Sequence, residues 1–254
     1  MINVVKPTDI PDVLAKKGKV ENDKNCKKYI TNPQAYINSE KKITIDKKIY
    51  GYITVKKALK SAQHEKCCFC EKSQVDEYGA VEHYRPKEGY KEKRGLKLKK
   101  PGYYWLGYSW SNLYFVCCPC NTRKGAIFPL TVEANRATHH KKNISTESPY
   151  LLDPSGKKDP RKHIVFDFQF IRGLTNFGKQ TVEVCGLNRE GLNTDRMELI
   201  DDIKARLAIL ERKKHHSLEE VKEAENFIRL SIRAEAKFSA TAIDYLKRTG
   251  IRLI

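Results

Sequence analysis

The sequence predicts an α+β fold, in which two short strands and a helix are pinned by a four-cysteine zinc site. Surrounding helices and a helical C-terminal region complete the prediction. Three observations carry it: two C-x-x-C motifs frame the middle of the 254-residue chain, short strand patterns lie beside them, and apolar residues near the C-terminus recur at helical spacing. We expect three regions, residues 1–60, 61–130 and 131–254.

Residues 1–60 are expected to form an extension that packs on or flanks the core. They show mixed helical and strand signals and no recognisable chemistry. The chain contains no apolar run near the ~20 residues that a bilayer span requires, and its start lacks the pattern of a signal peptide. We therefore expect a cytoplasmic protein that has no membrane partner.

Basic side chains outnumber acidic ones by 49 to 31, which gives a formal net charge of +18. Residues 1–66 contribute +8 of this excess, and the segment Arg85–Pro101 holds eight basic residues against two acidic ones. A surface of this kind attracts phosphate backbones without any sequence preference. The alternative is a basic surface that is merely solvated.

Six of the eight cysteines lie in two clusters. The C-x-x-C spacing lets one tight turn point two thiolates at one ion, and two such turns complete a closed, structural zinc site. In a reducing compartment a metal is favoured over disulfides. The alternatives are a redox pair, unrelated buried cysteines, or a C-x-C register that uses Cys68 or Cys118. The isolated Cys26 and Cys185 are expected to be small buried hydrophobic residues. The predicted zinc ligands are Cys67, Cys70, Cys117 and Cys120.

The segments beside the cysteines predict a strand–strand–helix unit. Residues 79–85 read as a short strand that Pro86 ends, and Leu113–Val116 reads as a second strand. A short helix is expected to begin near Pro119 and to end near Gly125. Zinc would then pin the base of the hairpin to the start of the helix.

This order of motifs resembles the HNH endonucleases and their ββα-metal fold. The matching features are C-x-x-C, Glu-His, Asn-Leu and C-x-x-C-N-x-x-K. The resemblance implies that His83 is the general base, that Glu82 is an acidic metal ligand, and that Asn112 braces the loop carrying the base. Asn121 falls where the final His of the family usually lies, so it would be a catalytic residue and a neutral oxygen ligand for Mg²⁺ or Mn²⁺.

The same residues suit phosphodiester cleavage on physical grounds. A histidine with an ordinary pKa of about 6.5 accepts a proton from water near neutral pH. A divalent cation held by Glu82 and Asn121 would stabilise the charge that develops on the leaving oxygen. The segment Lys87–Lys100 reads as an inserted basic loop that contacts the substrate, or as a flexible solvated insertion. The predicted nucleic-acid-binding residues are Arg85, Lys87, Lys91, Arg94, Arg123 and Lys124.

Later motifs extend the resemblance. The segments 147–154 and 186–189, together with Val-Glu-His-Tyr-Arg-Pro-Lys and Trp-Ser-Asn-Leu, are similar to the HNH subunit of Septu-type anti-phage systems (PtuB-like). Members of that family also occur beside retrons. The resemblance covers roughly residues 60–200 and implies a toxic effector that acts with a separate ATPase (PtuA-like). This chain has no G-x-x-x-x-G-K-[ST] motif to cradle a triphosphate.

The C-terminal region reads as helices. Apolar residues recur at helical spacing between Ile200 and Leu210, and Ser217–Glu220 is a capping-box signature. These helices are expected either to pack against the core or to dock onto a partner protein. The pairs His139-His140 and His215-His216 lie in basic surroundings and are expected to be solvated rather than to bind metal.

The sequence thus predicts a metal-dependent HNH endonuclease that hydrolyses phosphodiester bonds of DNA or tRNA. A zinc-stabilised module that binds nucleic acid or protein without cutting is the alternative from another class. A DNA restriction-type nuclease that acts alone is a third possibility. The set of Glu82, His83, Asn112 and Asn121 separates the nucleases from a pure binder, which has no need of it.

Overall fold

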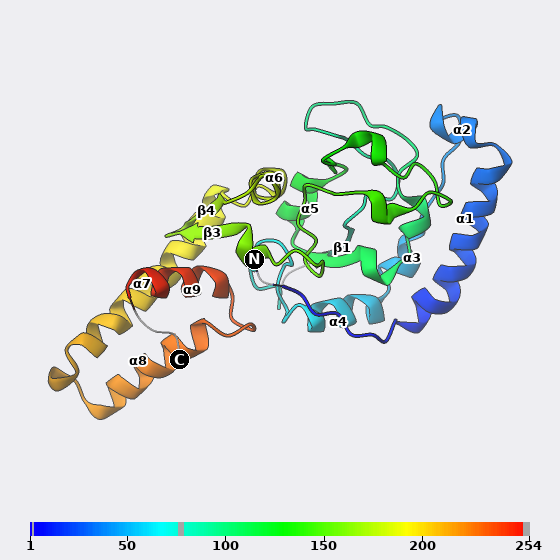
Figure 1. The fold of residues 1–254 in the computed structure, drawn as a ribbon. Coiled ribbons are helices and arrows are strands. Elements are labelled where there is room, and N and C mark those ends of the chain that lie inside the picture. The colour runs from blue at the N-terminus through cyan, green and yellow to red at the C-terminus, as the bar shows by residue number, and fades with distance from the viewer. Residues whose placement is uncertain (2, 76–78, 251–254) are drawn as a thin grey trace.

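The structure, a computed structural model, describes residue 1, residues 3–75 and residues 79–250. Helices surround two small antiparallel sheets, so the described part of the chain is an α+β protein, as predicted (Figure 1). The helices are α1 (Lys19–Thr31), α2 (Pro33–Ile37), α3 (Lys47–Tyr50), α4 (Ile53–Ala62), α5 (Cys118–Lys124), α6 (Asn176–Cys185), α7 (Glu190–Glu211), α8 (Leu218–Ser231) and α9 (Ser239–Arg248). The strands are β1 (Ala80–His83), β2 (Leu113–Val116), β3 (Ile164–Asp167) and β4 (Phe170–Gly173).

Strands β1 and β2 form an antiparallel hairpin, in which Ala80 lies opposite Val116 and His83 lies opposite Leu113. Helix α5 follows β2 directly and packs against β1. Both strands and this helix lie where the sequence predicts them, with ends that differ by one or two residues. The structure therefore contains the expected strand–strand–helix unit.

Local chemistry accounts for the boundaries of this unit. Pro86 follows β1 closely and has no backbone donor for a strand ladder. Pro119 lies in the first turn of α5, where a helix needs no donor. Gly125 ends α5 with a φ of +45°, a conformation that favours glycine. Gly79 precedes β1, where a Cβ atom would lie only 2.3 Å from the ring of Phe115.

Strand β2 is buried on both faces and belongs to two hydrophobic clusters. Leu113 and Phe115 pack in the cluster that contains the buried side chains of the N-terminal helices. Tyr114 and Val116 pack in the larger cluster, which contains the cysteines and side chains of α6, α7 and α9. The hairpin therefore carries the N-terminal region on one face and the C-terminal region on the other.

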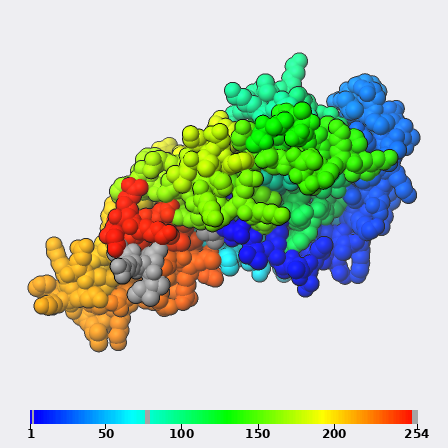
Figure 2. Space-filling model, viewed as in Figure 1, coloured from blue at the N-terminus to red at the C-terminus, as the bar shows by residue number. Residues whose placement is uncertain are grey.

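A second hairpin, β3–β4, and helices α6 to α9 form the C-terminal region. Helix α6 packs on β4, and α9 packs on both β3 and α7. Helices α7 and α8 pack along each other as an arm that projects away from α1 to α5 (Figures 1 and 2). The predicted capping box begins α8, where Ser217 Oγ accepts from the Glu220 amide and the Glu220 carboxylate accepts from the Ser217 amide.

Among the described residues of the N-terminal region, the regular secondary structure is helical, although the sequence carries mixed signals. The strand-like alternation falls on residues 42–46, which have no regular secondary structure. Ile43 and Ile45 of this segment are buried, so the alternation reflects a half-buried segment that pairs with no strand. None of the described helices is both long enough and apolar enough to cross a membrane.

Candidate functional site

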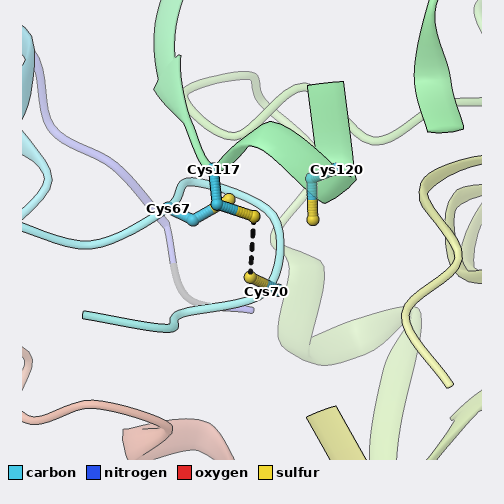
Figure 3. Close-up of side chains that lie close together, drawn as sticks. All are labelled: Cys67, Cys70, Cys117 and Cys120. Carbon is cyan, nitrogen blue, oxygen red and sulfur yellow. Dashed lines mark hydrogen bonds between the residues drawn. The ribbon is translucent and has the colours of Figure 1, made fainter. Parts of the chain in front are cut away.

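The four predicted zinc ligands converge at the base of the first hairpin (Figure 3). Cys67 and Cys70 come from the turn before β1, whereas Cys117 and Cys120 lie at the start of α5. All four are buried, and their Sγ atoms lie within 4.8 Å of one another. The Sγ atoms of Cys70 and Cys117 are 3.7 Å apart. Four sulfurs bound tetrahedrally at about 2.3 Å from zinc lie about 3.8 Å from each other. The cluster is therefore compatible with a structural zinc ion.

The structure also decides the register of the two cysteine motifs. Cys68 and Cys118 are not among the converging sulfurs, and Cys118 is exposed. Burial raises the pKa of the Cys68 thiol well above its ordinary value, which favours the neutral form. The isolated Cys185 is buried, as predicted, whereas Cys26 is only half-buried.

The guanidinium group of Arg189 lies against the cysteine cluster. Its Nη1 atom donates to the sulfur of Cys120 at 3.4 Å, and its Nη2 atom donates to Cys117 at 3.6 Å and to Cys70 at 3.8 Å. Four thiolates around one Zn²⁺ would leave an excess of negative charge, which this partly buried cation would offset. Arg189 lies between α6 and α7, so it also ties the C-terminal region to the metal site. The sequence places Arg189 in a family motif but gives it no role.

His83 ends β1 and is 2% exposed. Its Nε2 atom lies 2.8 Å from the backbone carbonyl of Gly107, so Nε2 carries the proton and Nδ1 holds the lone pair. Nδ1 is buried and has no hydrogen-bond partner among the described residues. Burial, assisted by the charge of Lys87, lowers the pKa of His83 to about 3, so the imidazole is neutral at neutral pH.

Asn112 holds the segment that follows His83. Its side-chain oxygen accepts from the backbone amide of Arg85 at 2.8 Å. Its Nδ2 atom donates to the carbonyl of Arg85 at 3.0 Å and to that of Leu106 at 3.2 Å. Asn112 is 3% exposed. The side chain thus fixes residue 85 on one side and the turn that supplies the Gly107 carbonyl on the other.

Glu82 lies next to α5 and is partly buried. Its Oε1 atom accepts from Nζ of Lys124 at 2.8 Å, and the same Nζ donates to the carbonyl of His83 at 2.8 Å. Lys124 is fully buried, so its ammonium group is occupied inside the protein and cannot reach a bound polyanion in this conformation. Asn121 lies one turn earlier on α5 and is partly exposed.

The other predicted nucleic-acid-binding residues fall into two groups. Arg85 pairs with the buried carboxylate of Glu147 at 3.0 Å, and Arg94 donates to the backbone carbonyls of Arg123 and Val184. These two guanidinium groups therefore support the fold. Arg94 is nevertheless exposed, as is Arg123, whereas Lys87 and Lys91 are partly exposed.

The sequence predicts that the pair His139-His140 is solvated, but in the structure both side chains also make contacts within the protein. Nδ1 of His140 lies 2.7 Å from the hydroxyl of Tyr104, and the rings of His139 and His140 pack against Tyr29. These contacts join α1 to the loop that carries the pair. His215, by contrast, is exposed at the end of the arm.

Two contributors to the site have no signature in the sequence. Gly107 acts through its carbonyl, and any residue type carries a carbonyl. Tyr50, from α3, lies edge-on to His83 with ring centroids 4.6 Å apart. This contact arises from packing between distant segments, so no local pattern indicates it.

Comparison with known proteins gives one curated relative. The chain is 33% identical over 157 residues to the Septu protein PtuB of Bacillus mycoides (strain KBAB4). The match covers 59% of this chain and 52% of the relative, so the chain spans about half the length of the curated relative it matches. No protein-family model matches the chain, and no solved structure matches it. The match confirms the predicted resemblance to PtuB-like proteins.

Proposed function

We propose that the protein is a metal-dependent HNH endonuclease and the effector component of a Septu-type anti-phage defence system. The similarity to a Septu protein PtuB supports the role in defence. The order β1, β2, α5 and the four-cysteine cluster at the base of the hairpin support the ββα-metal arrangement that the resemblance implies. In this reading the zinc ion is structural, because all four of its positions are taken by cysteines.

The observation that carries the proposal is the way in which His83 is held. The carbonyl of Gly107 accepts from Nε2, which leaves the lone pair on Nδ1 free to accept a proton. Asn112 braces the backbone on both sides of this contact. A structural histidine in a core would be expected to satisfy both ring nitrogens. We therefore assign His83 as the general base that deprotonates the attacking water.

The oxygen atoms next to His83 support a site for a divalent cation. The Glu82 carboxylate and the His83 carbonyl already surround one positive charge, the ammonium of Lys124, at 2.8 Å each. Oxygen donors of this kind suit Mg²⁺ or Mn²⁺. Glu82 and Asn121 would hold the cation, which would stabilise the charge on the leaving oxygen. Lys124 fixes Glu82 relative to the backbone of His83, so it positions the proposed ligand against the base.

We take the substrate to be nucleic acid, either DNA or tRNA. The net charge of +18 and the exposed lysines of the 87–100 loop support binding to a phosphate backbone. A separate PtuA-like ATPase is the proposed partner, and the nucleotide-binding function would come from that partner, since this chain has no G-x-x-x-x-G-K-[ST] motif.

The test is a cleavage assay on plasmid DNA and on total tRNA, with and without a PtuA-like ATPase. Wild type is compared with His83→Ala and with His215→Ala, a matched control at the exposed end of the arm. Each reaction is run with added Mg²⁺, with added Mn²⁺ and with neither. Chelators are avoided because they would also remove a structural zinc ion.

We expect cleavage by wild type and His215→Ala with added metal, and none by His83→Ala. Equal cleavage by His83→Ala would overturn the assignment of the base. If none of the proteins cuts either substrate, the zinc-stabilised binding module becomes the better reading. Cleavage of DNA without the ATPase would favour a nuclease that acts alone.

A further inference from the structure

Four lysines from two distant parts of the chain line one small hollow on the surface. Lys41 and Lys42 come from the N-terminal region, and Lys87 and Lys100 come from the two ends of the basic loop. The hollow has a volume of about 10 Å³, enough for roughly one water-sized group. The remaining lining residues are Tyr36, Ile43, Glu88, Pro101, Gly102 and Tyr104. We call it the lysine notch.

Backbone packing builds the notch. Gly102 lies so close to residues 86–89 that a Cβ atom on it would be 2.3 Å from the Gly89 amide nitrogen and 2.6 Å from the Pro86 carbonyl oxygen. The amide of Tyr103 donates to the same carbonyl at 2.8 Å. The start of the basic loop is therefore held against its end, which brings Lys87 and Lys100 to one place.

The charges around the notch are unbalanced. Glu88 is the acidic residue among its lining side chains, and it pairs with Lys42 at 3.1 Å. Lys41, Lys87 and Lys100 line the same hollow and have no carboxylate partner in the lining. Like charges gathered around one small hollow repel one another, and a bound anion relieves that repulsion.

The notch lies beside the candidate base. The Nζ atom of Lys87 is 5.1 Å from the centre of the Tyr50 ring, and this ring contacts His83. Lys87 therefore belongs both to the notch and to the surroundings of His83. A phosphate bound in the notch would hold its strand against the surface that covers the base.

We infer that the lysine notch binds a backbone phosphate of the nucleic-acid strand, so that Lys41 and Lys42 extend the substrate surface into the N-terminal region. The inference rests on the proposed function for the identity of the strand. The small volume fits a phosphate oxygen and excludes a base or a whole nucleotide, which favours a polymer that lies across the notch. Part of the N-terminal excess charge of +8 then has a role.

The experiment measures binding alone. Full-length protein carrying His83→Ala is titrated with a fluorescent DNA duplex and with fluorescent tRNA, without added Mg²⁺ or Mn²⁺, at several salt concentrations. The test variant adds Lys41→Gln and Lys42→Gln. The matched control adds Lys213→Gln and Lys214→Gln, which remove the same charge from the far end of the arm (Figure 1). Circular dichroism checks that each variant is folded.

Loss of the one phosphate contact in the notch lowers the slope of log K against log salt for duplex DNA by about 0.9. We expect a fall of this size in the test variant and little change in the control. Equal slopes in the two variants would overturn the inference, as would binding of polyglutamate as tight as that of nucleic acid, which would indicate an acidic protein partner. Because this experiment measures binding and not cleavage, its result can be interpreted even if the nuclease assay shows no activity.

Discussion

The ring of Tyr50 lies edge-on against the imidazole of His83, with centroids 4.6 Å apart and planes 74° apart. Tyr50 is buried, and with the surrounding segment it leaves His83 only 2% exposed. A general base must reach the water that it deprotonates. A pKa of about 3 also makes the buried imidazole a weak base. In this structure α3 therefore covers His83.

Removal of the cover should expose the base. In Tyr50→Ala we expect His83 to become reactive toward diethyl pyrocarbonate, measured by mass spectrometry of the modified peptide, whereas wild type stays protected. Loss of a buried aromatic ring should lower the free energy of unfolding by about 3 kcal/mol. In the proposed nuclease, exposure should also raise the cleavage rate.

Tyr52→Ala is the matched control, because Tyr52 lies two residues away and is 49% exposed. It should leave both the protection of His83 and the free energy of unfolding close to those of wild type. Persistent protection of His83 in a folded Tyr50→Ala protein would contradict the role of Tyr50 as its cover.

The burial of His83 also predicts a pH dependence of stability. Burial lowers the pKa of His83 from 6.5 to about 3, so between these values the unfolded chain binds a proton that the folded protein does not. The difference in the pKa of His83 between the two states contributes fully to the free energy of unfolding above pH 6.5. This contribution is lost as the pH falls from 6.5 toward 3. Between pH 7 and pH 5 wild type should lose about 2 kcal/mol more than His83→Gln, measured by urea unfolding.

Both proteins keep the cysteine cluster, so loss of zinc on acidification affects them alike and cancels in the comparison. Equal losses in wild type and His83→Gln would mean that His83 binds its proton in the folded protein near its ordinary pKa.

Local chemistry made much of this fold predictable. The strand patterns and the prolines predicted the positions of β1, β2 and α5, because Pro86 and Pro119 restrict the backbone of the residues next to them. The C-x-x-C spacing indicated one shared metal site, although the choice between Cys67 and Cys68 depended on which sulfur turns inward. Long-range contacts were not predictable. The sequence predicts that Lys124 binds nucleic acid, and only the packing of α5 on β1 shows that it is buried against Glu82.

Arg189 should contribute to zinc affinity. Its guanidinium group donates to three of the four cluster sulfurs, so Arg189→Met removes both the hydrogen bonds and the offsetting charge. We expect zinc to bind 10- to 100-fold more weakly, roughly the effect of losing a partner of the metal ligands. Competition with a chromogenic chelator measures this affinity directly.

Two cysteine variants serve as controls for the measured zinc affinity. Cys120→Ser should abolish stoichiometric zinc binding, because Cys120 is one of the four converging residues. Cys118→Ser should leave it unchanged, because Cys118 is exposed and outside the cluster. If Arg189→Met binds zinc as tightly as Cys118→Ser does, the contacts of Arg189 with the sulfurs make no energetic contribution to metal binding.

Asn112 is expected to support the base through the backbone rather than by touching the substrate. Asn112→Asp keeps the acceptor for the Arg85 amide but loses the donors to the carbonyls of Arg85 and Leu106. Two buried carbonyls without donors, next to a buried carboxylate, should lower the free energy of unfolding by about 2–4 kcal/mol. In the proposed nuclease, the fall should appear in kcat with little change in KM, because the substrate contacts are intact while His83 is misplaced. A variant that folds and keeps the wild-type kcat would show that the contact between His83 and Gly107 needs no brace from Asn112.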